Sequence, residues 1–484
     1  MNKNRLTQVV WLVVLTIGIL FILSLIPPID IHHFTTRQID ILSSIKTKPA
    51  PAVEEEEILL QEDTIAITID TITTDTLIVD TIAADTVVRP VREVLRKEGD
   101  ITLIEDYSAH GNGLRHLTSA MERIQSPGRT VRIAFLGDSF IEADILTQNI
   151  REALQSNYGG CGVGYMAMHS DFPGFRQSIV QSSKGWKTSN VAQNAEIRRS
   201  SLPLQLHRSE GNAVTNLRGT DRLQHIDRWD VTTIGFVAEG DATISIKTDS
   251  TTHTYDVTAQ EDAQFLVVNE PTSRVEVRCN SSQVAMWGCW LDGTQGVAVD
   301  NISIRGYSGT SINTLPLHYL KQLDKALPHD LIVLQYGLNR MTPSITDYSS
   351  YTRQLVDAIH HLRAAFPHAD ILIMGIGDRC QNENGEITTM KAVYGMTKAQ
   401  RNAAIEAGCL FWDSCEAMKS LGGMPTFVNN KWAGKDYTHI NHKGGAVLAQ
   451  EFIKALDHAM HKRNAVVENQ PDTLDNTLLQ QDYE

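Results

Sequence analysis

Ser139 is the first side chain in the sequence whose setting suggests covalent chemistry. It lies in the run Phe-Leu-Gly-Asp-Ser-Phe, residues 135–140, after an apolar segment over 131–136 and before a segment with helical spacing. A glycine-containing turn after a strand lifts a serine hydroxyl to the sheet edge where open α/β sheets bind ligands. A helix starting there would direct its N–H groups at the same point. The simpler alternative is that Asp138 and Ser139 cap a helix.

A serine nucleophile needs a base, and the sequence offers one near its other end. His439 follows Asp436 by three residues in Asp-Tyr-Thr-His. At this spacing the carboxylate can bind imidazole Nδ1, which leaves Nε2 to take the serine proton. His442 lies nearby, but nothing at the right spacing orients it. Taken alone, an Asp-x-x-His pair more often has a surface or capping role.

Two loops between these positions contain groups that can stabilise negative charge. Residues 306–310 (Gly-Tyr-Ser-Gly-Thr) and 337–339 (Gly-Leu-Asn) each follow an apolar strand-like run. A glycine lets its own N–H approach an oxyanion closely, and the Asn339 amide can donate beside it. Seen alone, either loop would be an ordinary connection, with Asn339 capping the next segment.

These groups need a scaffold that brings the ends of distant strands together. From about residue 100 the sequence alternates buried-strand candidates with helical periodicity, as where Leu146, Ile150 and Leu154 recur every fourth residue. Strand and helix in alternation predict a parallel sheet covered on both faces. The expected strands are 131–136, 302–305, 331–335, 371–375 and 409–412, with helices over 114–124 and 445–461.

Between residues 166 and 298 the pattern changes to short alternating segments split by polar turns. These segments lie at 242–247, 254–258, 265–269, 275–279 and 284–290. They predict an antiparallel β-sandwich inserted into the α/β domain.

The N-terminus has the features of a membrane anchor. Residues 9–26 are apolar without interruption, with Lys3 and Arg5 before them and two prolines after. Eighteen helical residues span roughly 27 Å, close to the hydrocarbon thickness of a bilayer. The positive-inside rule then predicts a single-pass protein of the inner (cytoplasmic) membrane, with its folded body in the periplasm or cell exterior. A cleaved signal peptide is the alternative, although no small-residue cleavage site follows.

Residues 47–92 carry repeated Asp-Thr pairs after a Pro- and Glu-rich start, which is typical of a stalk. The sequence therefore predicts seven segments: a cytoplasmic N-terminus (1–8), a transmembrane anchor (9–27), an acidic Thr/Asp-rich stalk (28–99), the first part of the α/β domain (100–165), the inserted β-sandwich (166–298), the second part of the α/β domain (299–463) and a disordered tail (464–484).

Composition argues against several classes of function. A formal net charge of −14 leaves no basic face for a phosphate backbone, so nucleic-acid binding is not expected. The six cysteines include no CxxC pair, which gives no support for zinc or thioredoxin chemistry. We expect no metal and no cofactor. An external location would permit disulfides, and we expect Cys279 and Cys289 as a local pair.

Four sequence blocks together resemble those of the SGNH (GDSL) hydrolase superfamily: Gly-Asp-Ser at 137–139, Gly-x-Ser-Gly at 306–309, Gly-x-Asn at 337–339 and Asp-x-x-His at 436–439. The resemblance covers roughly residues 100–165 and 299–463. It implies a three-layer, flavodoxin-like α/β fold with Ser139 as nucleophile, His439 as general base and then acid, and Asp436 as its orienting partner. It also implies an oxyanion hole made by the N–H groups of Ser139 and Gly309 and the side chain of Asn339.

Two residues depart from the family pattern. Phe140 stands where leucine or histidine is commoner, and Arg340 stands where aspartate is frequent. Neither change removes a reacting group, and Arg340 would place positive charge near the site, which suits an acidic substrate. A looser resemblance, carried by 141–144, 158–164, 290–293 and 375–379, is to envelope esterases related to bacterial peptidoglycan O-acetylesterases. These have a carbohydrate-module-like β domain, so the insertion here either binds glycan or acts as a structural lid.

The resemblance implies a serine esterase that removes acetyl or other short acyl groups from cell-envelope glycan, such as peptidoglycan, through an acyl-Ser139 intermediate. The same residues would serve a polysaccharide O-acetyltransferase, in which a sugar hydroxyl replaces water. A lipase or thioesterase and a non-catalytic, glycan-binding envelope adaptor are further alternatives. The expected partners are an envelope polysaccharide or peptidoglycan substrate and, through the N-terminal helix, the membrane; the sequence names no protein partner.

Overall fold

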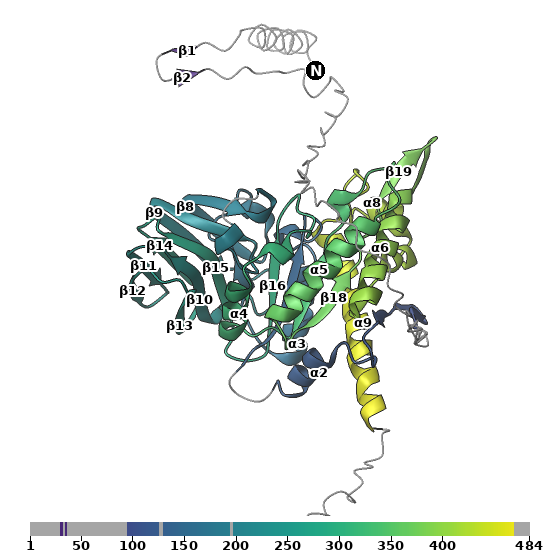
Figure 1. Cartoon of the computed structure of the whole chain (residues 1–484), viewed down its shortest axis with the longest axis horizontal. Helices are drawn as coiled ribbons and strands as arrows, with labels where there is room; N and C mark the ends of the chain where they lie inside the picture. Colours follow the sequence, from purple (N-terminus) through teal and green to yellow (C-terminus); the bar gives the residue numbers. More distant parts are fainter. Residues whose placement is uncertain (1–29, 32–33, 36–93, 125–128, 194–196, 469–484) are drawn as a thin grey trace, which may run out of the picture. The chain divides into compact units, whose positions relative to one another are not determined.

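A computed structural model describes residues 30–31, 34–35, 94–124, 129–193 and 197–468 of the chain (Figure 1). The chain divides into two compact units, Met1–Val88 and Arg89–Glu484. In the first unit, β1 (Asp30–Ile31) pairs antiparallel with β2 (Phe34–Thr35). The second unit contains the elements described below, after a short hairpin of β3 (Lys97–Glu98) and β4 (Ile101–Thr102).

A six-stranded sheet forms the centre of the second unit. Three of its inner strands are mainly apolar and fully buried, which is typical of a parallel sheet covered on both faces. The order is β16 (Val297–Ser303), β6 (Val131–Gly137), β17 (Leu331–Gln335), β18 (Asp370–Met374), β21 (Leu410–Trp412) and β5 (Ile104–Asp106). The first five strands are parallel and β5 is antiparallel. Because the parallel strands follow the chain order 2-1-3-4-5, their carboxyl ends form a crevice beside β6, where the strand order reverses.

Two groups of helices pack on this sheet (Figure 1). In one group α3 (Thr147–Tyr158) packs against α9 (His442–Glu468), and Phe452 of α9 contacts the rings of Phe135 and Trp412 in the sheet. In the other, α5 (Ser349–Ala365) packs against α4 (Leu317–Ala326) and α6 (Lys391–Ala407). The remaining helices are α2 (Arg115–Glu122), α7 (Ser414–Ser420) and α8 (Gly423–Asn429).

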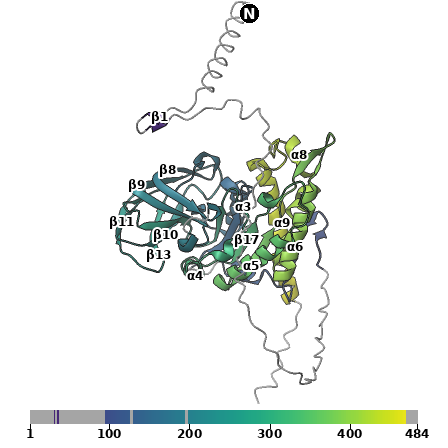
Figure 2. The same ribbon diagram turned by 45° about the horizontal axis from the view of Figure 1, so that its top comes forward.

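Nine further strands form one antiparallel sheet beside the α/β part (Figure 2). Along its path β12, β11, β14, β9, β15, β10 and β13 are neighbours, while β7 pairs with β15 and β8 with β9. The bounds are β7 (Gly164–Met166), β8 (Ile179–Asn190), β9 (Gln205–Gly219), β10 (Trp229–Ala238), β11 (Ala242–Lys247), β12 (Thr252–Val257), β13 (Gln264–Thr272), β14 (Arg274–Cys279) and β15 (Val284–Asp292).

Strand β15 is buried on both faces and joins two hydrophobic cores. Trp287 belongs to the core shared with the α/β part, whereas its neighbour Met286 belongs to a second core enclosed by the antiparallel sheet. The register of β15 shifts next to Gly288, which has φ +140°. After this bulge the alternation reverses, so that Cys289 faces the second core and Trp290 the shared one.

A buried ion triad also connects the two sheets. Arg132 of β6 binds Asp292 at the end of β15, with 2.6 Å between Nη2 and Oδ2. The other arm of the guanidinium binds Asp300 of β16 through Nη1, 2.9 Å from Oδ2. Asp300 Oδ1 in turn accepts a hydrogen bond from the Tyr165 N–H of β7. The antiparallel sheet is thus held to the central sheet by charge as well as by apolar packing.

The predicted fold class is wrong in several respects. The central sheet is mixed, because β5 adds an antiparallel edge strand that is only three residues long and has no clear alternation. The insertion forms one large antiparallel sheet, since β9 and β15 pair and link strands that were expected to form two separate sheets. The predicted pairing of Cys279 with Cys289 is also wrong, because both are free thiols on strands that do not pair with each other.

The predicted membrane anchor is corrected too. Across the described parts of the chain, none of the helices combines the length and apolarity needed to cross a bilayer; α9 has 27 residues but carries charged side chains along its length. The described residues therefore do not support the predicted transmembrane helix over 9–27 or the predicted single-pass inner-membrane location with an external body. Residues 1–29, most of the predicted stalk and residues 469–484 lie outside the described residues, and α9 continues to Glu468, past the predicted start of the tail at 464.

Candidate active site

Ser139, His439 and Asp436 meet at the carboxyl edge of the central sheet. Ser139 lies in the turn after β6, and its Oγ is 3.2 Å from His439 Nε2. The other ring nitrogen, Nδ1, is 2.7 Å from Asp436 Oδ2. The side chains of His439 and Asp436 are 47% and 51% exposed, so the site is open to solvent. In this geometry Nδ1–H donates to the carboxylate, and Nε2 can accept a proton from the serine.

The loop before α9 is shaped so that the carboxylate and the imidazole face each other. The Gly434 N–H donates to the His439 carbonyl at 2.8 Å and closes the loop. Within it Tyr437 has φ +53°, a left-handed conformation that is strained for a side chain of this size. Asp436 Oδ1 accepts hydrogen bonds from the backbone N–H groups of Thr438 and His439.

These bonds hold Asp436 in its charged form. Partial burial would raise the pKa of the carboxyl, but the hydrogen bonds from the His439 side chain and from the two backbone N–H groups outweigh it, so the pKa is lowered. Asp436 is therefore ionised and can stabilise an imidazolium on His439.

Asn339 lies beside the serine but its amide already has partners. The strand β17 ends at Gln335, and a short 3-10 helix, Leu338–Arg340, presents Asn339. Its Nδ2 donates to Asp138 Oδ2 and to the Tyr307 carbonyl, both at 3.0 Å. To donate to an oxyanion, this amide has to share one of these bonds.

Asp138 was not singled out by the sequence pattern except as a helix cap. It is fully buried directly before Ser139, and its second oxygen, Oδ1, accepts from the Phe140 N–H at 2.9 Å. Burial raises the pKa of this carboxyl to about 7, although the bonds from Phe140 and Asn339 and the charge of His439 lower it. A buried Asp that accepts from two N–H groups beside a serine is a signal that only the fold reveals.

Gly309 belongs to the loop after β16 and has φ +78°. A Cβ at this position would lie 2.6 Å from the Tyr336 ring, so the backbone here needs glycine for both conformation and space. A Cβ at Gly306 would have no neighbour within 4 Å, although φ is also positive there. The tight packing therefore distinguishes Gly309 from Gly306.

The segment after Ser139 differs from the expected helix start. A 3-10 turn, Glu142–Asp144, comes first, and α3 begins only at Thr147. Ala143 and Asp144 have positive φ angles, 57° and 66°. The buried Asp144 carboxylate fixes this turn: it binds Arg151 at 2.7 Å and Arg176 at 3.3 Å and accepts from Ser178 Oγ at 2.6 Å.

The structure also places three other residues that the sequence brought forward, Phe140, Arg340 and His442. Phe140 is buried against Gly377. Arg340 is exposed in the same short helix as Asn339. His442 does not point to the serine; its Nε2 lies 3.0 Å from the Phe175 carbonyl, and its Nδ1 lies 3.0 Å from Gln148 Nε2.

Fold and site together define the chain as an α/β protein in which hydrogen bonds connect a serine, a histidine and an aspartate at the carboxyl edge of the central sheet. In structure it is similar to a peptidoglycan O-acetylesterase, with 20% sequence identity over 74% of this chain and 99% of that chain and a TM-score of 0.61. A family two carbohydrate esterase from Cellvibrio japonicus is more distant, with 11% identity over 58% of this chain and 99% of that chain and a TM-score of 0.25. No family model matches the chain, and no curated protein matches its sequence.

The first of these comparisons shows a shared fold. As a likeness of fold, it confirms the looser resemblance to peptidoglycan O-acetylesterases that residues 141–144, 158–164, 290–293 and 375–379 carry. Within the described ranges no group of three or more His, Cys, Asp or Glu is placed to hold a metal ion.

Proposed function

We propose that this protein is a serine esterase that removes acetyl or other short acyl groups from a glycan, with O-acetylated peptidoglycan as the first candidate substrate. The observation that carries the proposal is the contact of Ser139 Oγ with His439 Nε2 at 3.2 Å while Asp436 holds Nδ1 at 2.7 Å. The shared fold with a peptidoglycan O-acetylesterase supports the choice of substrate.

In this mechanism His439 takes the Ser139 proton as Oγ attacks the ester carbonyl. Asp436 stabilises the imidazolium that forms. The negative charge of the tetrahedral intermediate is stabilised by the Ser139 and Gly309 N–H groups and by the Asn339 amide.

Collapse of this intermediate breaks the bond to the sugar oxygen, which receives the proton from His439 and leaves as a hydroxyl. Water then attacks the acyl-serine, with His439 again as base, and releases the carboxylic acid.

The test is acetate release from O-acetylated peptidoglycan by the purified protein and by Ser139→Ala and His439→Ala variants. Each substitution is expected to lower turnover on the order of 10⁴-fold or more, because the nucleophile and its base act as one unit. Ser344→Ala, which changes an exposed serine in a loop, serves as the matched control and should keep full activity.

Acetate release by Ser139→Ala equal to that of the wild type would refute the nucleophile assignment. The product also decides between water and a sugar as acceptor: free acetate supports the hydrolase, whereas an acetylated acceptor glycan without free acetate contradicts it.

A further inference from the structure

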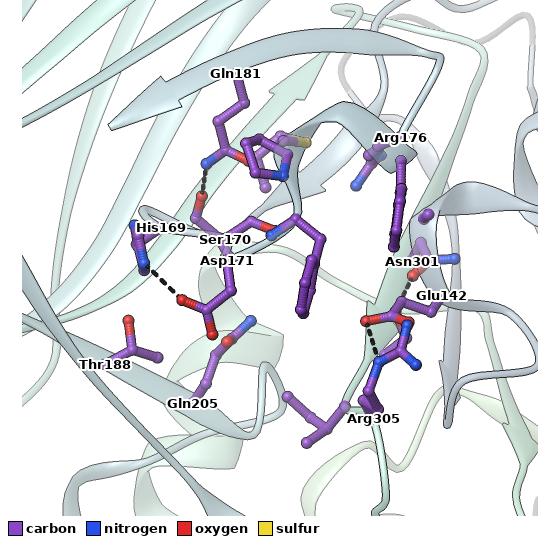
Figure 3. Close-up of a pocket in the computed structure, with 18 of the residues that line it drawn as sticks. Glu142, His169, Ser170, Asp171, Arg176, Gln181, Thr188, Gln205, Asn301 and Arg305 are labelled. Atoms are coloured by element: carbon purple, nitrogen blue, oxygen red, sulfur yellow. Dashed lines mark hydrogen bonds and ion pairs between the residues drawn. The ribbon is translucent and has the colours of Figure 1, made fainter. Parts of the chain in front are cut away.

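A cavity of about 260 Å³ lies beside the candidate active site, between the antiparallel sheet and the α/β part (Figure 3). Two residues connect it to the site along the chain. Glu142 lies three positions after Ser139, and Arg305 begins the loop that leads to Gly309. These two side chains form an ion pair on one side of the cavity. The segment that follows the nucleophile and the start of the loop that leads to Gly309 therefore form part of the cavity wall.

The loop between β7 and β8 gives the cavity an aromatic surface. Phe172 and Phe175 are 52% and 54% exposed, although large apolar side chains are usually buried. Their rings stack with centroids 5.4 Å apart and an interplanar angle of 8°. The Arg305 guanidinium lies over Phe172, 5.7 Å from the ring centroid. Such a flat, exposed ring can pack against the C–H groups of a sugar ring, which are attracted to its negative face.

Bonds to the active-site elements hold this loop in place. The Phe175 carbonyl lies 3.0 Å from Nε2 of His442, the first residue of α9 and three positions after His439. Arg176 binds the buried Asp144 in the turn that follows Ser139, and its guanidinium also donates to the Tyr165 and Val163 carbonyls. The aromatic surface is thus fixed to both segments that carry the candidate reacting groups.

The opposite wall of the cavity is polar. Figure 3 shows Asp171, Thr188 and Gln205 around one end of the space. The Gln205 amide is oriented by its bond to Tyr165 Oη at 3.1 Å, and Asp171 by His169 Nε2 at 3.2 Å, while 82% of the Asp171 side chain is exposed. Hydroxyl, amide and carboxylate groups facing an aromatic ring match a ligand that is apolar on its faces and carries hydroxyls at its edge.

We propose that this cavity binds a pyranose ring of the glycan substrate, stacked on Phe172 and hydrogen-bonded by Asp171, Thr188 and Gln205. The ring is a neighbour, in the glycan strand, of the sugar whose ester reaches Ser139. This proposal rests on the proposed function. In it, the cavity between the two sheets selects glycan esters over small esters. The cavity volume of about 260 Å³ lies just below the range of about 300–1,000 Å³ that is usual for ligand sites, which fits one ring better than a longer segment.

The kinetic test compares O-acetylated peptidoglycan fragments with p-nitrophenyl acetate, which offers the acyl group without a sugar. In Phe172→Ala we expect kcat/KM on the fragments to fall, mainly through KM, by about tenfold more than on p-nitrophenyl acetate; tenfold corresponds to about 1.4 kcal/mol of binding. Phe172→Trp, which keeps an aromatic face, should restore most of the difference. Tyr394→Ala, which removes an exposed ring from α6, should change neither substrate.

A binding measurement separates this proposal from the proposed function. Ser139→Ala is titrated with deacetylated peptidoglycan fragments by calorimetry, with and without Phe172→Ala, and the second substitution should weaken binding about tenfold. If Phe172→Ala weakens binding while the wild-type protein releases no acetate, the sugar site is upheld and the esterase is refuted. Equal effects of Phe172→Ala on both esters, or unchanged binding, would overturn the sugar site even if Ser139 proves to be the nucleophile.

Discussion

Asp138→Asn is expected to abolish most of the turnover without unfolding the protein. Asp138 is fully buried and accepts two hydrogen bonds, from the Phe140 N–H at 2.9 Å and from Asn339 Nδ2 at 3.0 Å. An asparagine has one oxygen and one NH₂ group in place of the two acceptors. If its oxygen keeps the bond to Phe140, its NH₂ faces the NH₂ of Asn339, and two donors oppose each other.

The size of the effect follows from what Asn339 would lose. At the fully buried position 138 the introduced NH₂ is a donor without an acceptor, which costs about 1–3 kcal/mol and is enough to turn the exposed Asn339 amide away. Loss of one oxyanion donor lowers turnover by about 10²–10³-fold. We therefore expect kcat to fall by about a hundredfold while KM changes little, because the contact acts mainly on the transition state.

Protonation of Asp138 should have the same consequence in the wild type. Burial raises the pKa of this carboxyl to about 7, and a protonated oxygen can no longer accept from both N–H groups. Turnover is therefore expected to rise with pH through about 7 as Asp138 ionises. That part of the rise should be absent from Asp138→Asn.

The same pKa shift predicts the effect on stability. The folded-state pKa of Asp138 is raised from 3.8 to about 7. The contribution of Asp138 to the free energy of unfolding is therefore fully present below pH 3.8 and is lost as the pH rises through about 7. At about 1.4 kcal/mol per unit, the ionised carboxylate costs about 4 kcal/mol at pH 8. Asp138→Asn avoids this cost, which exceeds the 1–3 kcal/mol lost by opposing two donors. The variant should thus have a Tm at pH 8 no lower than that of the wild type.

The assay is acetate release over pH 5–9 together with thermal unfolding at each pH. A variant with normal kcat at pH 8 would refute the idea that Asp138 orients Asn339. If the variant has a low kcat and also a Tm lowered by many degrees, the loss of turnover comes from unfolding instead. Asn339→Ala provides the comparison, and its effect should not add to that of Asp138→Asn in the double variant.

Two further predictions concern packing. Arg132→Leu leaves Asp292 and Asp300 buried without their cation and should destabilise the fold by about 3–5 kcal/mol, measured by denaturant unfolding; an unchanged midpoint would contradict the role of the triad. Gly309→Ala places a Cβ 2.6 Å from the Tyr336 ring at a positive φ and should lower kcat at least tenfold by moving its N–H, whereas full activity would exclude that N–H from the oxyanion hole.

The sequence predicted elements best where hydrophobic periodicity was strong. The strand expected at 331–335 is β17, and the segment expected at 242–247 is β11. By contrast, β8 and β9 were missed because their side chains are largely polar and are interrupted by Gly185 and Gly211, both with positive φ. Their place is set by pairing with each other and with β14 and β15, and single-sequence periodicity does not report such pairing.

The site could be predicted in part. Two of the four short blocks contain Ser139, His439 and Asp436, and the structure brings these three within hydrogen-bond distance. The supporting groups could not be found in this way. Asp144 and Arg176 are far apart in sequence and look like ordinary surface charges. In the structure the Asp144 side chain is fully buried and only 14% of the Arg176 side chain is exposed, and their contact depends on the antiparallel sheet packing against the turn after the serine.

The shared core has a consequence for how this chain can be divided. Trp287 and Trp290 of the antiparallel sheet belong to the same buried cluster as Phe135 and Leu334 of the central sheet. A fragment cut at either end of the insertion would expose these indoles to water, and the remaining α/β part would lose one wall of its interior. The antiparallel sheet is therefore no detachable module that could be grafted onto another enzyme, although its strands form a contiguous stretch of sequence.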